Sequence, residues 1–297
     1  MTIRAYAQQG GGIDKGCFHR KAVHVTYAEE LDPSESVLAF YATELRRRRE
    51  AAGMSQRALA KEALMAPSLL NKVEAARRLP TKPLSVVADK MLAADEFFTR
   101  LCPVVIRHAY PAWFRPFVDL EAAATVIRSF QAQVVPGLLQ TADYARAVLS
   151  AGRLNRDTVE ELVTARLERQ HILTRDKPPE LWIVLDENVL RRRMGRVDTM
   201  RGQLDRLLVA AETPNVVLQV VSFDAGAHAG VGGPFSALTL DEGPDVVYVD
   251  GFLQGQILAE REHVKAAARV YDLLMADALS PSRSIDLIAD ALKDLKP

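Results

Sequence analysis

Hydrophobic residues recur every three or four positions along much of this chain, which predicts a largely helical protein. The first such segment begins with Leu38, Tyr41 and Leu45. The same spacing predicts further helices at 84–91, 123–134, 141–148, 156–173, 204–211, 264–271 and 285–295.

Shorter, continuous apolar runs predict four β-strands. They lie at 181–185, 216–221, 235–240 and 246–249. The last two runs are joined across 241–245, whose Gly243-Pro244 is a strong turn signal. Helices before, inside and after a small sheet indicate an α+β domain that follows a smaller, all-α domain.

The 297-residue chain is long enough for two domains. We predict a flexible arm at 1–36, a small helical domain at 37–101, a connector at 102–118 and an α+β domain at 119–297. Three prolines are expected to interrupt any long helix in the connector, and its aromatic residues are expected to pack it against the larger domain. These residues are Pro103, Pro111, Pro116, Tyr110, Trp113, Phe114 and Phe117.

Within the small domain, two short helices are predicted with a tight turn between them. Ser55 is a good N-cap for the first helix, and Pro67 is well suited to open the second. Leu70 and Val73 share one face of that second helix and can pack it against the first. The opposite face carries Ser68, Leu69, Asn71 and Lys72. This arrangement is typical of a helix-turn-helix, whose second helix enters the major groove of DNA.

Charge favours the same interpretation. Between Glu44 and Lys82 the chain has ten basic and four acidic residues, a net charge of +6, whereas the whole chain sums to zero. A basic module on an acidic body suits phosphate binding, although a solvated charged helix face remains the alternative. We predict that double-stranded DNA is bound by Gln56, Arg57, Ser68, Leu69, Asn71, Lys72, Arg77 and Arg78.

The stretch Ser55-Gln56-Arg57-Ala58-Leu59-Ala60, with Val73-Glu74 further on, resembles the Cro/repressor-type (XRE) helix-turn-helix family. Two positions depart from the family pattern. Leu64 replaces the turn glycine, and Ala66 replaces the serine cap of the second helix. Because a leucine at positive φ is strained, we expect either a rebuilt turn or a differently buried Leu64.

A second resemblance starts at the segment 135–146, Val-Pro-Gly-Leu-Leu-Gln-Thr-Ala-Asp-Tyr-Ala-Arg. It resembles the signature of an actinobacterial C-terminal domain of unknown function that follows an XRE helix-turn-helix in WhiJ-like regulators. Further matches occur at 166–170, 186–190, 203–204, 225–229, 233–235 and 247–250. The resemblance implies a transcription regulator whose larger domain receives a signal, often alongside a small partner protein.

Several polar residues of the larger domain are candidates for binding a ligand or partner. They are Gln140, Tyr144, Arg146, Arg166, Arg169, Gln170 and His228. The alternative for 136–144 is a packing corner between helices. The arginines can hold either an external anion or the carboxylates of Asp186 and Glu187, and an internal ion-pair network is preferred. His228 lies in a small-residue loop of a kind that can close over ligands.

Metal binding and catalysis are not expected. Cys17, His19 and His24 lie close in sequence, but incidental clustering explains three such residues better than a metal site does. A catalytic set is limited to Asp186, His228, Asp250 and His263, and no nucleophile or zinc-protease motif accompanies them. We therefore predict no cofactor, no metal and no enzymatic activity.

The chain also lacks an apolar run of the ~20 residues that cross a bilayer, and its amino terminus lacks the apolar core of a signal peptide. A cytoplasmic, nucleoid-associated location is expected. The prediction is a homodimeric, sequence-specific DNA-binding regulator, a repressor in preference to an activator, controlled by a small partner protein or a small-molecule effector. The alternatives are a protein-binding module of a two-protein, antitoxin-like pair and, less favoured, a small-molecule-processing enzyme.

Overall fold

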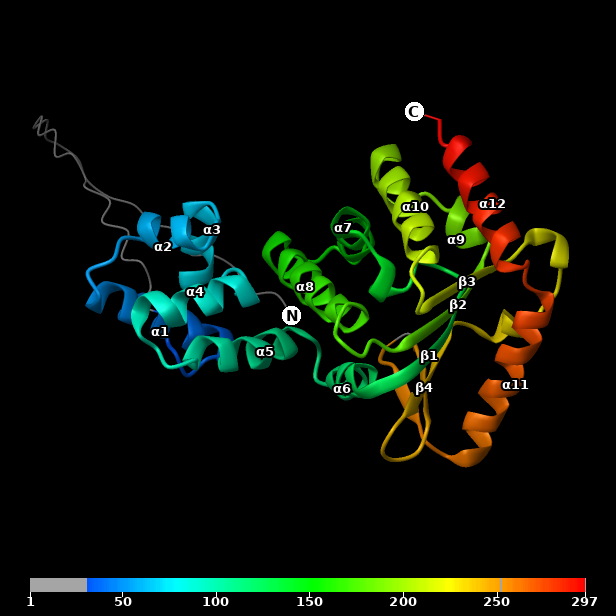
Figure 1. Ribbon diagram of the computed structural model, residues 1–297, viewed down its shortest axis with the longest axis horizontal. Coiled ribbons are helices and arrows are strands. Elements are labelled where there is room, and N and C mark those ends of the chain that lie inside the picture. Colours follow the sequence, from blue (N-terminus) through cyan, green and yellow to red (C-terminus); the bar gives the residue numbers. More distant parts are fainter. Residues whose placement is uncertain (1–30, 252, 297) are drawn as a thin grey trace, which may run out of the picture. The chain divides into compact units, whose positions relative to one another are not determined.

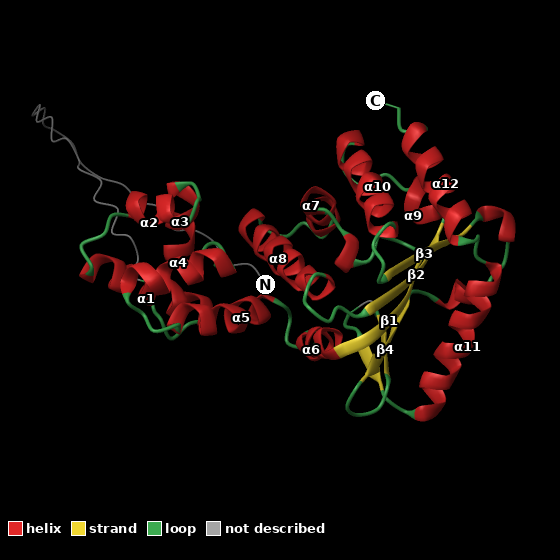
Figure 2. Ribbon diagram, viewed as in Figure 1, coloured by secondary structure: helices red, strands yellow, loops and turns green. Residues whose placement is uncertain are grey.

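The computed structural model describes residues 31–251 and 253–296 (Figure 1). Residues 1–30, which include most of the predicted arm and Cys17, His19 and His24, lie outside this range. The described chain has a helical N-terminal part followed by a mixed sheet with helices, so the α+β prediction is confirmed (Figure 2). No helix in the described ranges combines the length and the apolar character that a membrane crossing requires.

The N-terminal part consists of five helices. They are α1 (Val37–Ala51), α2 (Gln56–Glu62), α3 (Pro67–Glu74), α4 (Lys82–Leu92) and α5 (Phe97–Ala109). Ser36, Ser55 and Thr81 cap three of them, each accepting a backbone N–H with its side-chain oxygen. Tyr41 and Phe98 lie at the centre of the shared core, where their rings meet edge to face. The helices predicted around Tyr41 and Leu84 are thus confirmed.

Pro103 does not interrupt a helix, so that prediction was wrong. It lies inside α5, where it removes one backbone hydrogen bond. The helix persists because Phe98, Cys102 and Val105 bury one face of it in the core. Pro116 instead lies in the first turn of α6 (Arg115–Ala123), where a missing N–H costs nothing.

The larger domain is built on a six-stranded sheet of order β3-β2-β1-β4-β5-β6. The strands are β1 (Ala124–Gln131), β2 (Glu180–Asp186), β3 (Val216–Val221), β4 (Phe235–Leu240), β5 (Val246–Val249) and β6 (Gln256–Leu258). β1, β2 and β3 are parallel, and β4, β5 and β6 continue antiparallel from β1. The four predicted strands are confirmed, and β1 and β6 are additional.

Helices cover both faces of this sheet (Figure 1). The helices of the larger domain are α7 (Ala142–Ser150), α8 (Arg156–Arg169), α9 (Asn188–Arg191), α10 (Val197–Ala211), α11 (Arg261–Asp277) and α12 (Pro281–Lys293). On one face α10 and α12 enclose a core with Ile127 and Leu181, and on the other α11 packs over Phe130 and Val184. The predictions of α7, α8, α10, α11 and α12 are confirmed.

The predicted helix at 123–134 is wrong, because this segment is β1, between β2 and β4. Ile127 and Phe130 are three residues apart, which suggested one face of a helix. In a strand, residues three apart point to opposite faces. Both are buried because Ile127 enters the core under α10 and α12, whereas Phe130 enters the core under α11.

Candidate nucleic-acid interface and internal cavity

The α2–α3 pair has the packing that the sequence predicts. Ser55 Oγ accepts the N–H of Ala58 at 3.2 Å, and Pro67 opens α3. Leu59, Leu70 and Val73 are almost completely buried between the helices. Their burial fixes α3 against α2 and leaves the opposite face of α3 in solvent.

The turn between α2 and α3 is neither rebuilt nor closed over a buried leucine. Leu64 adopts φ +51° and its side chain is 95% exposed. The N–H groups of Leu64 and Met65 donate to Lys61 O and Ala60 O at 3.1 and 2.9 Å, which is how a left-handed residue ends a helix. The leucine therefore occupies the glycine position with its strain retained, and Ala66 gives α3 no side-chain cap.

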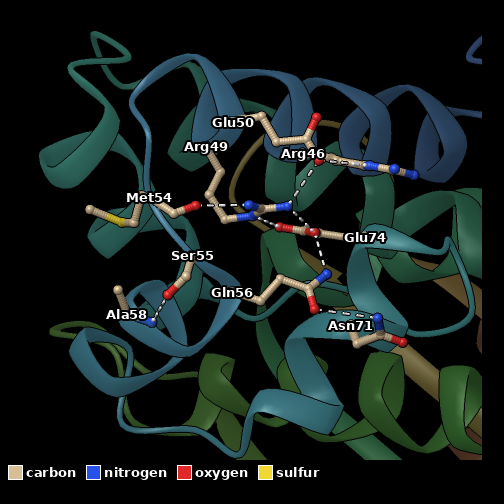
Figure 3. Close-up of polar contacts among 9 residues, drawn as sticks. All are labelled: Arg46, Arg49, Glu50, Met54, Ser55, Gln56, Ala58, Asn71 and Glu74. Carbon is tan, nitrogen blue, oxygen red and sulfur yellow. Dashed lines mark hydrogen bonds and ion pairs between the residues drawn. The ribbon is translucent and has the colours of Figure 1, made fainter.

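Glu74, at the end of α3, is the centre of a buried hydrogen-bond network (Figure 3). Arg49 of α1 donates to both carboxylate oxygens, at 2.6 and 2.9 Å, and Gln56 Nε2 donates to Oε2 at 2.7 Å. Arg49 Nη1 also donates to Met54 O at 2.8 Å. The hydrogen bonds to Glu74 raise the pKa of Arg49. This network, here named the Glu74 clamp (Arg49, Met54, Gln56, Glu74), joins α1, α2 and α3.

Asn71 is attached to the clamp by one long contact. Its Nδ2 donates to Gln56 Oε1 at 3.4 Å, and the side chain is otherwise exposed on α3 (Figure 3). An amide in this position can rotate to make two hydrogen bonds to an adenine edge.

The four arginines of α1 are mostly neutralised locally. Arg46 pairs with Glu50, and Arg47 and Arg48 pair with Glu44, at 2.8–3.1 Å. Arg48 also lies over the Phe97 ring, with its guanidinium carbon 4.3 Å from the centroid. In the helical domain 37–101, most of the exposed basic residues without an ion pair instead belong to α2, α3 and the 77–82 segment. They are Arg57, Lys61, Lys72, Arg77 and Lys82, and the two elsewhere are Lys90 and Arg100.

The predicted DNA-binding residues form one exposed group and one half-buried group. Arg57, Ser68, Asn71, Lys72 and Arg77 are exposed. Gln56, Leu69 and Arg78 are half-buried, and Gln56 is held by the Glu74 clamp. A surface of polar and basic side chains therefore surrounds the exposed face of α3.

The larger domain contains a cavity of about 350 Å³. Three of the predicted ligand-binding residues, Gln140, Arg166 and Arg169, line it. Arg166 Nη1 donates to Gln140 Oε1 at 2.6 Å. Gln170 stabilises the 137–140 segment of the cavity wall, because its Nε2 donates to Gly137 O and Gln140 O at 2.9 and 2.7 Å.

Arg169 pairs with Glu121 of α6, not with Asp186 or Glu187 as one prediction had it. The Nε–Oε2 distance is 3.0 Å, but the two atoms lack hydrogen-bond geometry and neither has another partner in the described chain. Burial raises the pKa of Glu121, against the nearby arginine charges. Glu187 instead pairs with Arg191 at 3.0 Å and accepts the N–H of Phe223.

The remaining ligand candidates lie outside the cavity. Tyr144 is buried, and its hydroxyl accepts the N–H of Val135 at 3.2 Å. Arg146 pairs with Glu160 at 2.5 Å and with Asp143 at 2.6 Å. These contacts, together with Thr141 capping α7, fit the packing-corner alternative for this segment.

Of the four residues considered for catalysis, the structure brings only Asp186 and His228 together, 3.3 Å apart. His228 Nδ1 accepts the N–H of Gly230, so its Nε2 carries the proton that faces Asp186. Asp250 accepts from the Tyr248 hydroxyl at 2.7 Å, and His263 contacts Glu260. No group of possible metal ligands occurs in 31–251 or 253–296.

The sequence analysis missed several residues that line the cavity. Glu121 and Tyr248 were not singled out, and Asp250 was considered for a catalytic set but not for a ligand site. The connector aromatics were expected to pack on the larger domain, and they do: Phe117 stacks on Tyr248 with ring centroids 4.1 Å apart. The sequence signal that could have revealed this site is the aromatic cluster at 110–117, because its rings line the cavity together with Arg166 and Arg169.

Comparison with known proteins agrees with this architecture. Residues 41–96 match a helix-turn-helix domain, which places the chain in the class of helix-turn-helix DNA-binding proteins. Residues 114–290 match the domain of unknown function DUF5753, and because this match spans more than half of the chain, the protein belongs to that family. No curated protein and no solved structure matches the chain.

Proposed function

We propose that this protein is a sequence-specific transcription regulator of the XRE type, whose C-terminal domain receives a signal. The observation that carries the proposal is the geometry of α3. Its inner face is fixed by Leu70, Val73 and the Glu74 clamp, while Ser68, Asn71 and Lys72 remain exposed. A rigid helix with polar side chains on its outer face suits insertion into a major groove.

The distribution of charge supports a phosphate-binding role around that helix. Because the α1 arginines are engaged with Glu44, Glu50 and Glu74, the unpaired positive charge of the described domain lies mainly on α2, α3 and 77–82. Lys72 and Arg77 can thus hold phosphates on either side of the groove that Asn71 and Ser68 contact.

The proposed oligomeric state and mode of regulation follow from how helix-turn-helix domains bind DNA. A homodimer places two recognition helices about one helical turn of DNA apart, which gives a palindromic operator. We propose repression, in the cytoplasm, with release of DNA when the C-terminal domain binds its effector and favours the DNA-free state. The WhiJ-like assignment belongs to this proposal and rests on the signature at 135–146.

The decisive experiment is a mobility shift of the full chain on DNA from its own upstream region, titrated with salt and nonspecific competitor. Specific retardation that survives competitor is the expected result. The matched control is Arg201→Ala, which removes an exposed arginine from α10 without touching α2 or α3. Weak binding that competitor abolishes, equal in wild type and in Lys72→Ala, would refute the proposal.

A second candidate is a role as the protein-binding member of a regulatory pair. Phe223 and Val231, in the segment between β3 and β4, are 59% and 78% exposed. Exposed apolar side chains of this size are common where a partner binds. Co-purification of a small polypeptide encoded nearby, lost in Phe223→Ser/Val231→Ser, would favour this candidate.

We also propose that the C-terminal domain binds its signal without chemically converting it. Each of the four groups considered for catalysis has a structural partner: Asn188 for Asp186, Gly230 for His228, Tyr248 for Asp250 and Glu260 for His263. Incubation of the protein with any identified effector should return the effector unchanged by mass spectrometry.

A further inference from the structure

The cavity in the larger domain has the size and walls of a small-molecule site. At about 350 Å³ it lies within the range of ~300–1,000 Å³ of known ligand pockets and would hold on the order of ten waters at ~30 Å³ each. Its walls are mostly apolar, and aromatic rings make up much of them. These rings belong to Tyr110, Trp113, Phe114, Phe117, Phe235 and Tyr248.

Arg166 is the cation of this cavity that lacks a counter-ion. Its one hydrogen bond in the described chain goes to the neutral Gln140 Oε1, and no carboxylate lies within ion-pair distance. Burial and the neighbouring charge of Arg169 lower its pKa to about 10. A guanidinium has five N–H donors in a planar fork, so most of the donors of Arg166 are unused.

The other charged groups restrict the charge of an occupant. Arg169 is already paired with Glu121, and Asp250, which also lines the cavity, accepts from Tyr248. The two arginines and two carboxylates of the wall sum to zero charge. A monocarboxylate on Arg166 therefore adds one negative charge and a dianionic phosphate adds two, so the monocarboxylate is the less costly occupant.

The absence of a side chain at Gly137 leaves room for the Arg169 guanidinium in the cavity wall. A methyl group at Gly137 would collide with Arg169 Nη2. Gly137 is part of the 135–146 signature, so this part of the signature keeps the second guanidinium paired with Glu121. Arg166 is consequently the arginine left for a ligand.

We propose that the cavity binds a small aromatic monocarboxylate, with its carboxylate on the Arg166 fork and its ring against Phe114, Phe117 and Tyr248. This inference names a ligand class for the signal-receiving role proposed above, and it rests on that role only for its biological meaning. Aromatic faces provide a flat apolar surface for the ring, and a charge-assisted hydrogen bond fixes the acid group.

The test uses the full chain and four probes, without DNA. Benzoate and 1-naphthoate are titrated by calorimetry beside their neutral counterparts, benzyl alcohol and 1-naphthylmethanol. We expect one site per chain, with at least one acid binding ~10-fold or more tightly than its alcohol. Arg166→Gln should weaken the acid by ~10–100-fold and leave the alcohol unchanged. Arg146→Gln is the matched control, because Arg146 does not line the cavity, and it should change neither.

A second measurement places the ligand in the cavity. Trp113 lines it and is 39% exposed, and the chain has two tryptophans. In a Trp182→Phe background, benzoate should change the emission of the remaining Trp113 with the affinity that calorimetry gives. Arg166→Gln is expected to fold, because it removes a charge that burial disfavours, and circular dichroism checks this.

Three results would overturn the proposal: no binding of either acid at millimolar concentration, equal binding of acid and alcohol, or acid binding that survives Arg166→Gln. A mobility shift with and without the bound acid separates this proposal from the regulator itself. DNA binding without acid binding removes the ligand proposal alone, and acid binding without DNA binding removes the regulator alone.

Discussion

The two buried arginine–glutamate pairs in the described part of the chain differ in how completely their hydrogen-bonding groups are satisfied. In the Glu74 clamp, Arg49 makes two short hydrogen bonds to Glu74, and Gln56 and Met54 occupy further sites. Arg169 and Glu121 approach to 3.0 Å without hydrogen-bond geometry, beside a cavity and a second arginine. A buried ion pair stabilises a fold only when its other donors and acceptors are satisfied, so the first pair is structural and the second borders a site.

The largest effect is expected from breaking the clamp. Glu74→Gln removes the closest counter-ion of the buried Arg49 and leaves it only the 3.3 Å contact with the exposed Glu50, which should lower the free energy of unfolding by ~3–5 kcal/mol. Urea unfolding followed by circular dichroism measures the change. The matched control, Asp290→Asn, breaks the exposed pair with Lys293 on α12, away from the clamp, and should cost far less. Equal effects of the two substitutions would mean that the clamp has no special role.

Asn71→Ala should reduce sequence discrimination without destabilising the Glu74 clamp. Because its one side-chain hydrogen bond within the described residues is the 3.4 Å contact with Gln56, we expect almost unchanged stability but a loss of ~1–3 kcal/mol of discrimination between operator sequences. Arg77→Ala should instead weaken binding to all sequences and reduce the salt slope by ~1. Fluorescence anisotropy on matched and mismatched operators distinguishes the two. A loss of stability in Asn71→Ala would place this residue inside the clamp.

The pH dependence of stability should differ in sign between two glutamates. Burial raises the pKa of Glu121, so its contribution is complete below pH ~4.5 and is lost as the pH rises through the raised pKa. The hydrogen bond from Arg146 lowers the pKa of Glu160, so its contribution is present above pH ~4.5 and is lost as the pH falls through the lowered pKa.

Thermal unfolding of the two glutamine variants checks this difference. Relative to Glu121→Gln, wild type should gain stability as the pH falls from 7 towards 4.5. Relative to Glu160→Gln, it should lose stability as the pH falls below 4.5. If the stability difference between wild type and variant changed with pH in the same direction for both variants, the opposite pKa shifts of Glu121 and Glu160 would be contradicted.

The smallest effect concerns the turn that precedes the recognition helix. Leu64→Gly relieves ~1–2 kcal/mol of left-handed strain and adds ~0.5–1 kcal/mol of backbone entropy cost, so a net gain of ~0–1.5 kcal/mol is expected. Ala58→Gly, on the exposed side of α2, should lose ~1 kcal/mol. A loss of stability in Leu64→Gly would show that the exposed leucine makes a stabilising contact.

The contrast between the two regions also shows what a sequence can predict. The helix-turn-helix depends on local signals, namely the Ser55 cap, Pro67 and the spacing of Leu70 and Val73, and these were predicted correctly. A rebuilt turn or a differently buried Leu64 was expected, and both alternatives are wrong, because Leu64 keeps its positive φ and is exposed. Only the path of the neighbouring chain decides whether a turn residue is covered.

The cavity depends on contacts between distant segments, which explains why prediction was poorer there. Gln140, Arg166 and Arg169 were listed separately as ligand-binding candidates, and the structure brings them to one cavity. The partner of Arg169, however, is Glu121 of α6 and not Asp186 or Glu187. The strand β1 was predicted as a helix, since a strand buried on both faces has no alternation to reveal it. Both errors arise from pairings that no local pattern encodes.

The position of the Glu74 clamp has a consequence for the divergence of this family. The groups that hold α3 in place lie at its last turn and on its inner face, whereas Ser68, Asn71 and Lys72 contribute almost nothing to that attachment. Substitutions at these three positions can therefore accumulate with little loss of folding stability. Duplicated copies of such a gene could acquire new operators by changing three codons, while the scaffold that carries them stays the same.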